Sequence, residues 1–158
     1  MSFKISVNDL VRQDHPYRQI LNLVNFEELT KPLESLYSSR GRAGYAISTG
    51  FKCLLLQFMN NLSDRELEEC IQDSMAAKLF VGFELEDDTP DHSYFTKLRA
   101  RIGTKRLADL FERIRLSLKE SQDLKEIFTF VDASSLESMV DTWKARDRAL
   151  ADLENDEK

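Results

Sequence analysis

The stretch AISTGFKCLLLQFMN, residues 46–60, decides the fold of this chain. Its apolar residues recur at intervals of three and four, the spacing that places side chains on one face of an α-helix. They are Ile47, Phe51, Leu54, Leu55, Phe58 and Met59. The pattern predicts an amphipathic helix with a wide buried stripe, and therefore a core built from helices.

The same period continues on both sides of this stretch. Apolar residues between positions 17 and 37 predict one or two short helices, with a kink or a new start at Pro32. Ser63 and Glu66 have the spacing of a capping box and predict the first turn of another helix. The residues expected on one face of that helix are Leu67, Cys70, Ile71 and Met75.

Two further helices are predicted beyond the acidic connector of residues 84–90. The first is capped by Asp91 or Ser93 and ends near Ile102, and Gly103 fits the position after its last turn. Its apolar residues Phe95, Leu98 and Ile102 are expected to face inward, and its basic residues Lys97, Arg99 and Arg101 to face elsewhere. The second helix covers residues 107–118. Gly82 is expected to end the helical stretch that precedes the connector.

The period changes after residue 125. Residues 127–131, IFTFV, are aromatic and β-branched, which is typical of a short buried strand. Asp132 follows this strand, and residues 139–153 read as an exposed, charge-rich helix. With 42% hydrophobic residues, three Pro and five Gly, the composition favours a helical core over a meander of short strands. No apolar run approaches the ~18 residues that a membrane span needs, so we expect a soluble, cytoplasmic protein.

The net charge of −6 and the pI near 5.0 argue, taken alone, against nucleic-acid binding. The charges are unevenly distributed, however. Residues 61–91 hold 2 basic and 10 acidic residues, whereas residues 92–125 hold 9 basic and 4 acidic residues. The basic segment could therefore meet phosphates even though the whole chain is acidic.

This basic segment is the first candidate site. Short helices joined by tight turns, the last of them basic, can form a helix-turn-helix-like unit whose second helix enters the major groove of DNA. An ordinary solvated basic helix face explains the same pattern. The candidate DNA-binding residues, including two in the small basic loop of residues 38–44, are Arg40, Arg42, Ser93, Tyr94, Thr96, Lys97, Arg99, Arg101, Lys105 and Arg106.

Asp132 is the second candidate site. A carboxylate at the end of a buried strand can serve as a ligand for Mg²⁺ in phosphoryl transfer, but it can equally cap the turn that follows. A two-metal site needs further acids. A self-sufficient nuclease would have to draw them from residues such as Glu137 or Asp141.

Four motifs together resemble a known family. They are LSDRELEE at residues 62–69, FVGF at 80–83, TPDHS at 89–93 and FVDAS at 130–134. In this order and spacing they resemble the N-terminal part of InsH-type insertion-sequence DDE transposases, and FVDAS resembles the strand that carries the first acid of the DDE triad. Asp132 corresponds to that acid.

The resemblance implies a mainly α fold with two parts. Residues 1–122 would form a helical bundle with a helix-turn-helix-like DNA-binding region, and residues 123–158 would start an incomplete RNase H-like catalytic domain. The implied partner is double-stranded DNA carrying the terminal inverted repeats, with full-length transposase or a second copy of the chain as a further partner.

Catalysis in the family uses Mg²⁺ held by two Asp and one Glu, of which this sequence carries only the first. We therefore expect no metal and no transposase activity from this chain alone. The alternative is an acidic helical protein–protein interaction module that does not bind nucleic acid.

Overall fold

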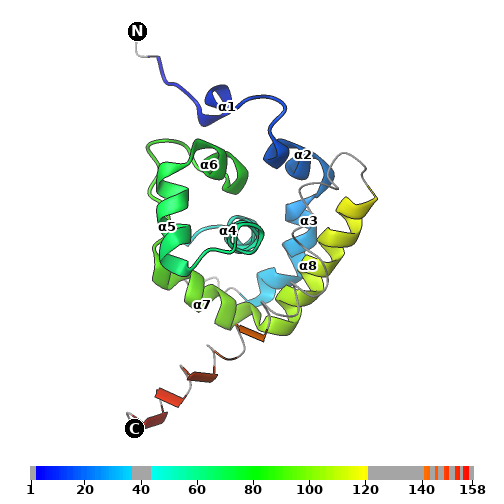
Figure 1. The fold of residues 1–158 in the computed structure, drawn as a ribbon, viewed down its shortest axis with the longest axis vertical. Coiled ribbons are helices and arrows are strands. Elements are labelled where there is room, and N and C mark those ends of the chain that lie inside the picture. Colours follow the sequence, from blue (N-terminus) through cyan, green and yellow to red (C-terminus); the bar gives the residue numbers. More distant parts are fainter. Residues whose placement is uncertain are drawn as a thin grey trace.

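Helix α4 (Ile47–Asn60) lies at the centre of the molecule, and the other helices surround it. In Figure 1 it is seen almost end-on, with α5, α6, α2, α3, α8 and α7 arranged around it. Neighbouring helices α3, α5, α6 and α7 pack directly against it. The stretch that predicted the fold is therefore the element on which the bundle is built.

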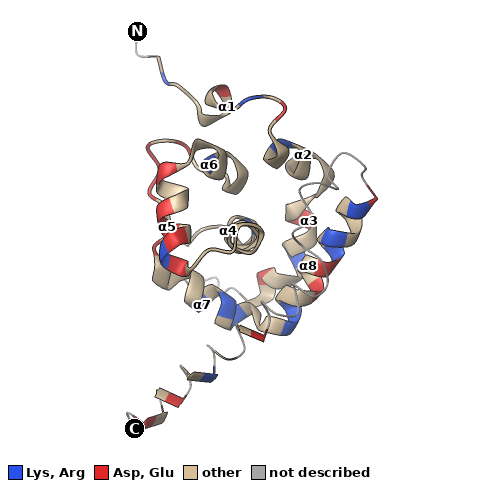
Figure 2. Cartoon of the chain, in the orientation of Figure 1, with Lys and Arg blue, Asp and Glu red and all other residues tan. Residues whose placement is uncertain are grey.

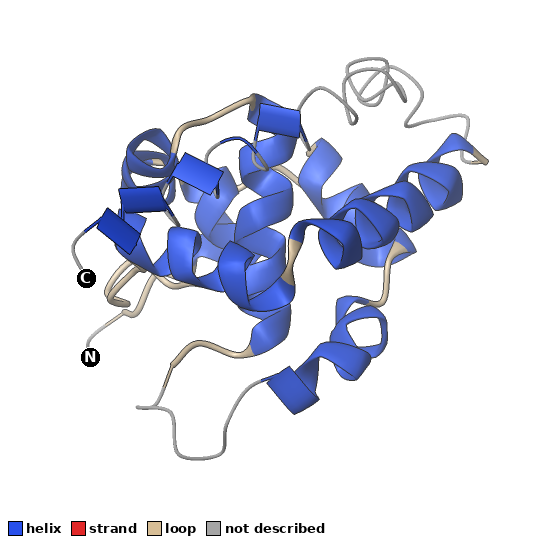
Figure 3. Cartoon of the chain, turned by 90° about the horizontal axis from the view of Figure 1, so that it is seen from below, coloured by secondary structure: helices blue, strands red, loops and turns tan. Residues whose placement is uncertain are grey.

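This computed structural model describes residues 3–36, 44–120 and scattered positions from 141 to 156. Every regular element in these segments is helical, and no strand occurs among them (Figure 3). The expected mainly α bundle is confirmed. The other helices are α1 (Val7–Leu10), α2 (Pro16–Leu23), α3 (Phe26–Thr30), the 3-10 helix η1 (Lys31–Leu36), α5 (Asp64–Asp73), α6 (Met75–Val81), α7 (His92–Ile102) and α8 (Thr104–Lys119).

Helix α4 is buried on more of its circumference than its apolar stripe predicted. Besides the apolar stripe, Ser48, Cys53, Leu56 and Gln57 are each at most 2% exposed. The expectation of an amphipathic helix with a wide stripe was too narrow, because helices cover α4 from several directions. Gly50 allows α7 to pack closely against α4. A Cβ atom at position 50 would lie 2.6 Å from the Tyr94 hydroxyl and 2.7 Å from a Leu98 methyl group of α7.

Aromatic rings fill the space between α4 and its neighbours. Phe51 of α4 contacts Phe26 of α3 and Phe111 of α8, with ring centroids 6.2 and 5.5 Å apart. The Phe58 ring stacks on Phe111 at 5.1 Å. Phe26 in turn meets Phe80 of α6 edge to face. These rings join α3, α4, α6 and α8 into one apolar core.

Most of the predicted helix boundaries are confirmed. The Ser63 and Glu66 side chains form the expected capping box at the start of α5. The Asp91 carboxylate caps α7 by accepting a hydrogen bond from the Tyr94 amide. Gly82 and Gly103 follow α6 and α7 with positive φ angles of 96° and 87°, which glycine adopts without steric cost. Pro32 lies in a separate 3-10 helix, which agrees with the kink or new helix start predicted at this residue.

The helix that begins after Ser63 is shorter than expected. It ends at Asp73, because Ser74 has an extended backbone and its hydroxyl accepts a hydrogen bond from the Ala77 amide to start α6. Leu67 and Ile71 are buried as predicted, whereas Met75 belongs to α6 and is 45% exposed. Placing Met75 on the same face was therefore wrong.

The predicted strand of residues 127–131 and the boundary between residues 122 and 123 lie outside the described residues. The described positions from 141 to 153 are helical and exposed, as expected for the charge-rich segment. None of the helices in the described part of the chain has the length and apolar character needed to cross a membrane.

Candidate nucleic-acid interface

The charged residues of the bundle are segregated by helix. Acidic residues are concentrated on α5 and on the connector between α6 and α7, whereas Lys and Arg residues occur at the end of α7 and along α8 (Figure 2). Helix α7 packs against α5, α4 and α8. It therefore stands between the acidic and the basic parts of the surface.

Arg99 of α7 is buried, with its side chain only 2% exposed. Its guanidinium donates to both carboxylate oxygens of Asp64 on α5, at 2.6 and 2.8 Å, and to the Gln57 side-chain oxygen on α4 at 3.1 Å. A two-pronged guanidinium–carboxylate pair of this kind is short and directional. It joins three helices at one point.

The Asp64 carboxylate is the centre of this network. It also accepts hydrogen bonds from the Thr96 hydroxyl and from the Gln57 amide, both at 2.7 Å. Burial by itself would raise the pKa of Asp64. The hydrogen bonds from Arg99, Thr96 and Gln57 and the positive charge of Arg99 outweigh that effect and lower the pKa to about 2.

The expectation that Arg99 faces away from the core is wrong. Arg99 follows Phe95 by four positions and precedes Ile102 by three, so all three lie on one side of α7. That spacing was visible in the sequence, as was Gln57, a polar residue inside the apolar run of α4. The partner Asp64 was not identified, because it lies 35 positions from Arg99 along the chain.

Two of the hydroxyl groups proposed as DNA donors, those of Ser93 and Thr96, form hydrogen bonds within the protein. Ser93 donates to the Asp91 carboxylate at 2.7 Å, and Thr96 donates to Asp64. The Tyr94 ring is half-buried and meets the rings of Tyr45 and Phe95 edge to face. These residues therefore belong to the helix cap and to helix packing.

The other basic candidates face solvent. Lys97, Arg101, Lys105 and Arg106 are all exposed. Lys97 and Arg101 are four positions apart on α7, whereas Lys105 lies beyond the break at Gly103, in the first turn of α8. Arg106 turns back, and its guanidinium donates to the Ile102 carbonyl at 3.1 Å. The structure thus brings together an exposed basic surface made of Lys97, Arg101, Lys105 and Arg106.

Two of the sequence motifs meet through a second contact between α5 and α7. The Glu68 carboxylate accepts a hydrogen bond from the His92 backbone amide at 3.1 Å, and the His92 Nδ1 atom lies 3.6 Å from the same carboxylate oxygen. The LSDRELEE segment therefore holds the helix that the TPDHS segment starts, once through Glu68 and once through Asp64.

Three of the predicted site residues, Arg40, Arg42 and Asp132, lie outside the described residues. Among the residues that are described, no group of three or more His, Cys, Asp or Glu side chains could hold a metal ion. The described part of the chain therefore offers the basic surface and its supporting network, and no metal centre.

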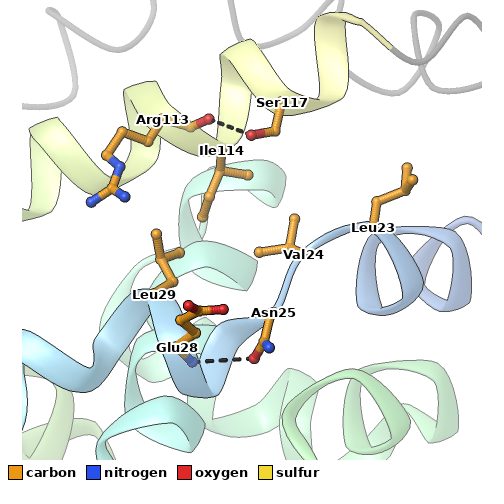
Figure 4. A pocket seen from close by; sticks show the side chains of 8 residues that line it. All are labelled: Leu23, Val24, Asn25, Glu28, Leu29, Arg113, Ile114 and Ser117. Carbon is orange, nitrogen blue, oxygen red and sulfur yellow. Dashed lines mark hydrogen bonds between the residues drawn. The ribbon is translucent and has the colours of Figure 1, made fainter.

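A shallow pocket of about 260 Å³ lies between the α2–α3 junction and α8 (Figure 4). Val24, Leu29 and Ile114 form its apolar wall, with Glu28 and Arg113 at its edge. No sequence pattern pointed to it, since its walls come from segments about 90 positions apart. Its polar groups do not converge on one point, so it defines no chemistry.

Acid should weaken the contribution of Asp64 to stability. The folded-state pKa of about 2 lies below the ordinary value of 3.8, so the contribution is present above pH 4 and is lost as the pH falls towards 2. We expect the difference in Tm between the wild type and Asp64→Asn to be largest above pH 4 and to shrink towards pH 2. Thermal unfolding followed by circular dichroism would measure it, and a difference independent of pH would contradict the assignment.

Together, the fold and this surface define a class of protein: a helical domain that presents cationic side chains from helices α7 and α8. The chain belongs to the family described as a transposase domain (DUF772), whose model matches residues 5–101. The match covers α1 to α6 and nearly all of α7, including Asp64, Arg99 and Lys97. No solved structure matches the chain.

Proposed function

We propose that this chain is a DNA-binding part of an insertion-sequence transposase and that it recognises the inverted repeats at the ends of the element. The observation that carries the proposal is the exposed basic surface of Lys97, Arg101, Lys105 and Arg106 in a transposase-domain family member. Helix α7 would enter the major groove as the second helix of a helix-turn-helix-like unit, with α5 and α6 preceding it.

The separation of charges supports this orientation. Affinity for DNA rests on cations that replace counterions along the phosphates, and it depends on local charge at the contact. The described helices α7 and α8 carry few acids, while α5 carries several (Figure 2). Presenting α7 and α8 to the duplex would keep the acidic side chains of α5 away from the phosphates.

The start of α8 also suits a phosphate. Gly103 precedes the helix and offers no side-chain cap, and Lys105 and Arg106 lie in the first turn. The amide groups of a helix N-terminus carry a partial positive charge that favours anions. This feature adds to the basic surface and would bring the α7–α8 junction to the DNA backbone.

The catalytic part of the proposal rests on Asp132 alone. By its resemblance to the DDE family it would be a Mg²⁺ ligand, and one carboxylate does not make a two-metal site. We propose that this polypeptide by itself does not transfer DNA strands. It would act at the element ends together with full-length transposase or a second copy of itself.

The test is binding to a duplex that carries the terminal repeat, measured by fluorescence anisotropy at several salt concentrations. We expect tighter binding to the repeat than to a scrambled duplex, with affinity falling as salt rises. In the triple variant Lys97→Ala, Arg101→Ala and Lys105→Ala we expect weaker binding and a salt slope smaller by about 3, one for each lost phosphate contact.

A matched control removes three exposed cations from other parts of the molecule. Lys4, Lys31 and Arg65 are exposed and lie outside α7 and α8. Their triple alanine variant changes the net charge by the same amount and should keep nearly the wild-type salt slope. Equal losses in the two triple variants would mean that binding follows total charge, and the proposed surface would be wrong.

The acidic surface of α5 favours one alternative, a protein–protein interaction module. Glu66, Glu69 and Asp73 are exposed on that helix. This alternative predicts no salt-dependent binding to either duplex, so the same titration separates the two functions.

A further inference from the structure

The hydrogen bonds around Asp64 not only join α4, α5 and α7 but also orient α7, because they hold one side of that helix at two residues. Thr96 and Arg99 are three positions apart, so their side chains leave the helix on the same face. Both donate to Asp64, at distances between 2.6 and 2.8 Å. Two directional contacts on one face determine how far the helix is rotated about its own axis.

The apolar contacts of α7 leave this rotation less well defined. Phe95, Leu98 and Ile102 are buried against the core, and burial of apolar area has no preferred direction. Hydrogen bonds to a carboxylate weaken steeply when their angles change. The network therefore fixes the rotation of α7 more tightly than its apolar contacts alone would.

The exposed face of α7 follows from that rotation. Lys97 and Arg101 are exposed, and Lys97 lies between Thr96 and Arg99 in the sequence without facing Asp64. A turn of the helix about its axis would move both cations, and the residues beside them, by the same angle. Base edges are read by hydrogen bonds of fixed geometry, so such a turn changes which bases can be recognised.

We propose that Asp64 is a positioning residue for sequence recognition: by holding Thr96 and Arg99 it sets the rotation of α7 and so the side chains that reach the bases. This inference rests on the proposed function. Asp64 binds the side of α7 opposite Lys97 and Arg101, so it would act on recognition without a contact to DNA of its own.

The experiment measures the ratio of the dissociation constants for a scrambled duplex and for the terminal-repeat duplex. Loss of stability reduces the fraction of folded protein and weakens binding to both duplexes by the same factor, so this ratio does not change. A rotated α7 weakens binding to the repeat more than it weakens binding to the scrambled duplex, because base contacts are made only with the repeat. In Asp64→Asn we expect the ratio to fall roughly tenfold, the effect of about one lost base contact.

Two further variants complete the test. Thr96→Val removes one hydrogen bond and keeps the Asp64–Arg99 pair, and it decides the question if Asp64→Asn does not fold. We expect it to lower the ratio in the same direction by a smaller factor. Ile71→Val, at a fully buried position of α5, is the control for stability and should leave the ratio unchanged.

The outcomes separate the inference from the proposed function. A wild-type ratio of one would overturn both, since there would be no sequence recognition to position. A wild-type ratio well above one that stays the same in folded Asp64→Asn and Thr96→Val would overturn the inference alone. A fall of equal size in Ile71→Val would assign the effect to stability and would also overturn it.

Discussion

The variant Arg99→Met should unfold about 3 kcal/mol more easily than the wild type in urea, as measured from the unfolding midpoint and slope. The reason is the partner that it leaves behind. The Asp64 side chain is 14% exposed, and without Arg99 its carboxylate loses both hydrogen bonds of the ion pair while those from Thr96 and Gln57 remain. A buried charge that loses its counterion destabilises the folded state by several kcal/mol. This loss is large because the whole free energy of unfolding of a native protein is only about 5–15 kcal/mol.

Lys97→Met is the matched control for this prediction. It removes a cation with the same substitution, two positions away on the same helix, at a side chain that faces solvent. Its effect should stay within about 0.5 kcal/mol. The double variant Asp64→Leu with Arg99→Met should recover part of the loss, because no buried charge is then left unpaired. If Arg99→Met matched Lys97→Met, the ion pair would have no role in stability.

The second large effect is expected at the centre of the core. Phe51→Ala should lower the free energy of unfolding by about 3–5 kcal/mol. The Phe51 side chain is completely buried and contacts the rings of Phe26 and Phe111, which belong to different helices. Its removal leaves a cavity beside α4 that the surrounding helices can close only in part, because each is held by other contacts.

Phe3→Ala provides the comparison for Phe51→Ala. It makes the same change in composition at a side chain that is 88% exposed. We expect its unfolding midpoint to stay close to that of the wild type. A loss at Phe51 no larger than the loss at Phe3 would contradict the central position of α4 in the bundle.

Helix positions and most helix ends were predictable from the sequence. The capping box of Ser63 and Glu66 and the glycines at positions 82 and 103 are local signals, since each depends on residues within about one helical turn. The apolar period identified α4 and the inward residues of α7 for the same reason. Ser74 was missed because serine can also occupy a helix interior, and only its extended backbone divides α5 from α6.

The candidate site was predictable only in part. The sequence identified the basic segment and its exposed members Lys97, Arg101, Lys105 and Arg106, because Lys and Arg side chains are mostly exposed in folded proteins. It misassigned Arg99, whose burial depends on Asp64 and Gln57, 35 and 42 positions away.

What this sequence determined by itself is therefore most of the helices and the charge that each of them carries. The tertiary structure decided which of those charges face solvent and which one is buried. A charged arginine side chain can be buried where a carboxylate offsets the loss of its hydration. Asp64 and Arg99 are far apart in the sequence, and it is the tertiary fold that brings their side chains to 2.6 Å.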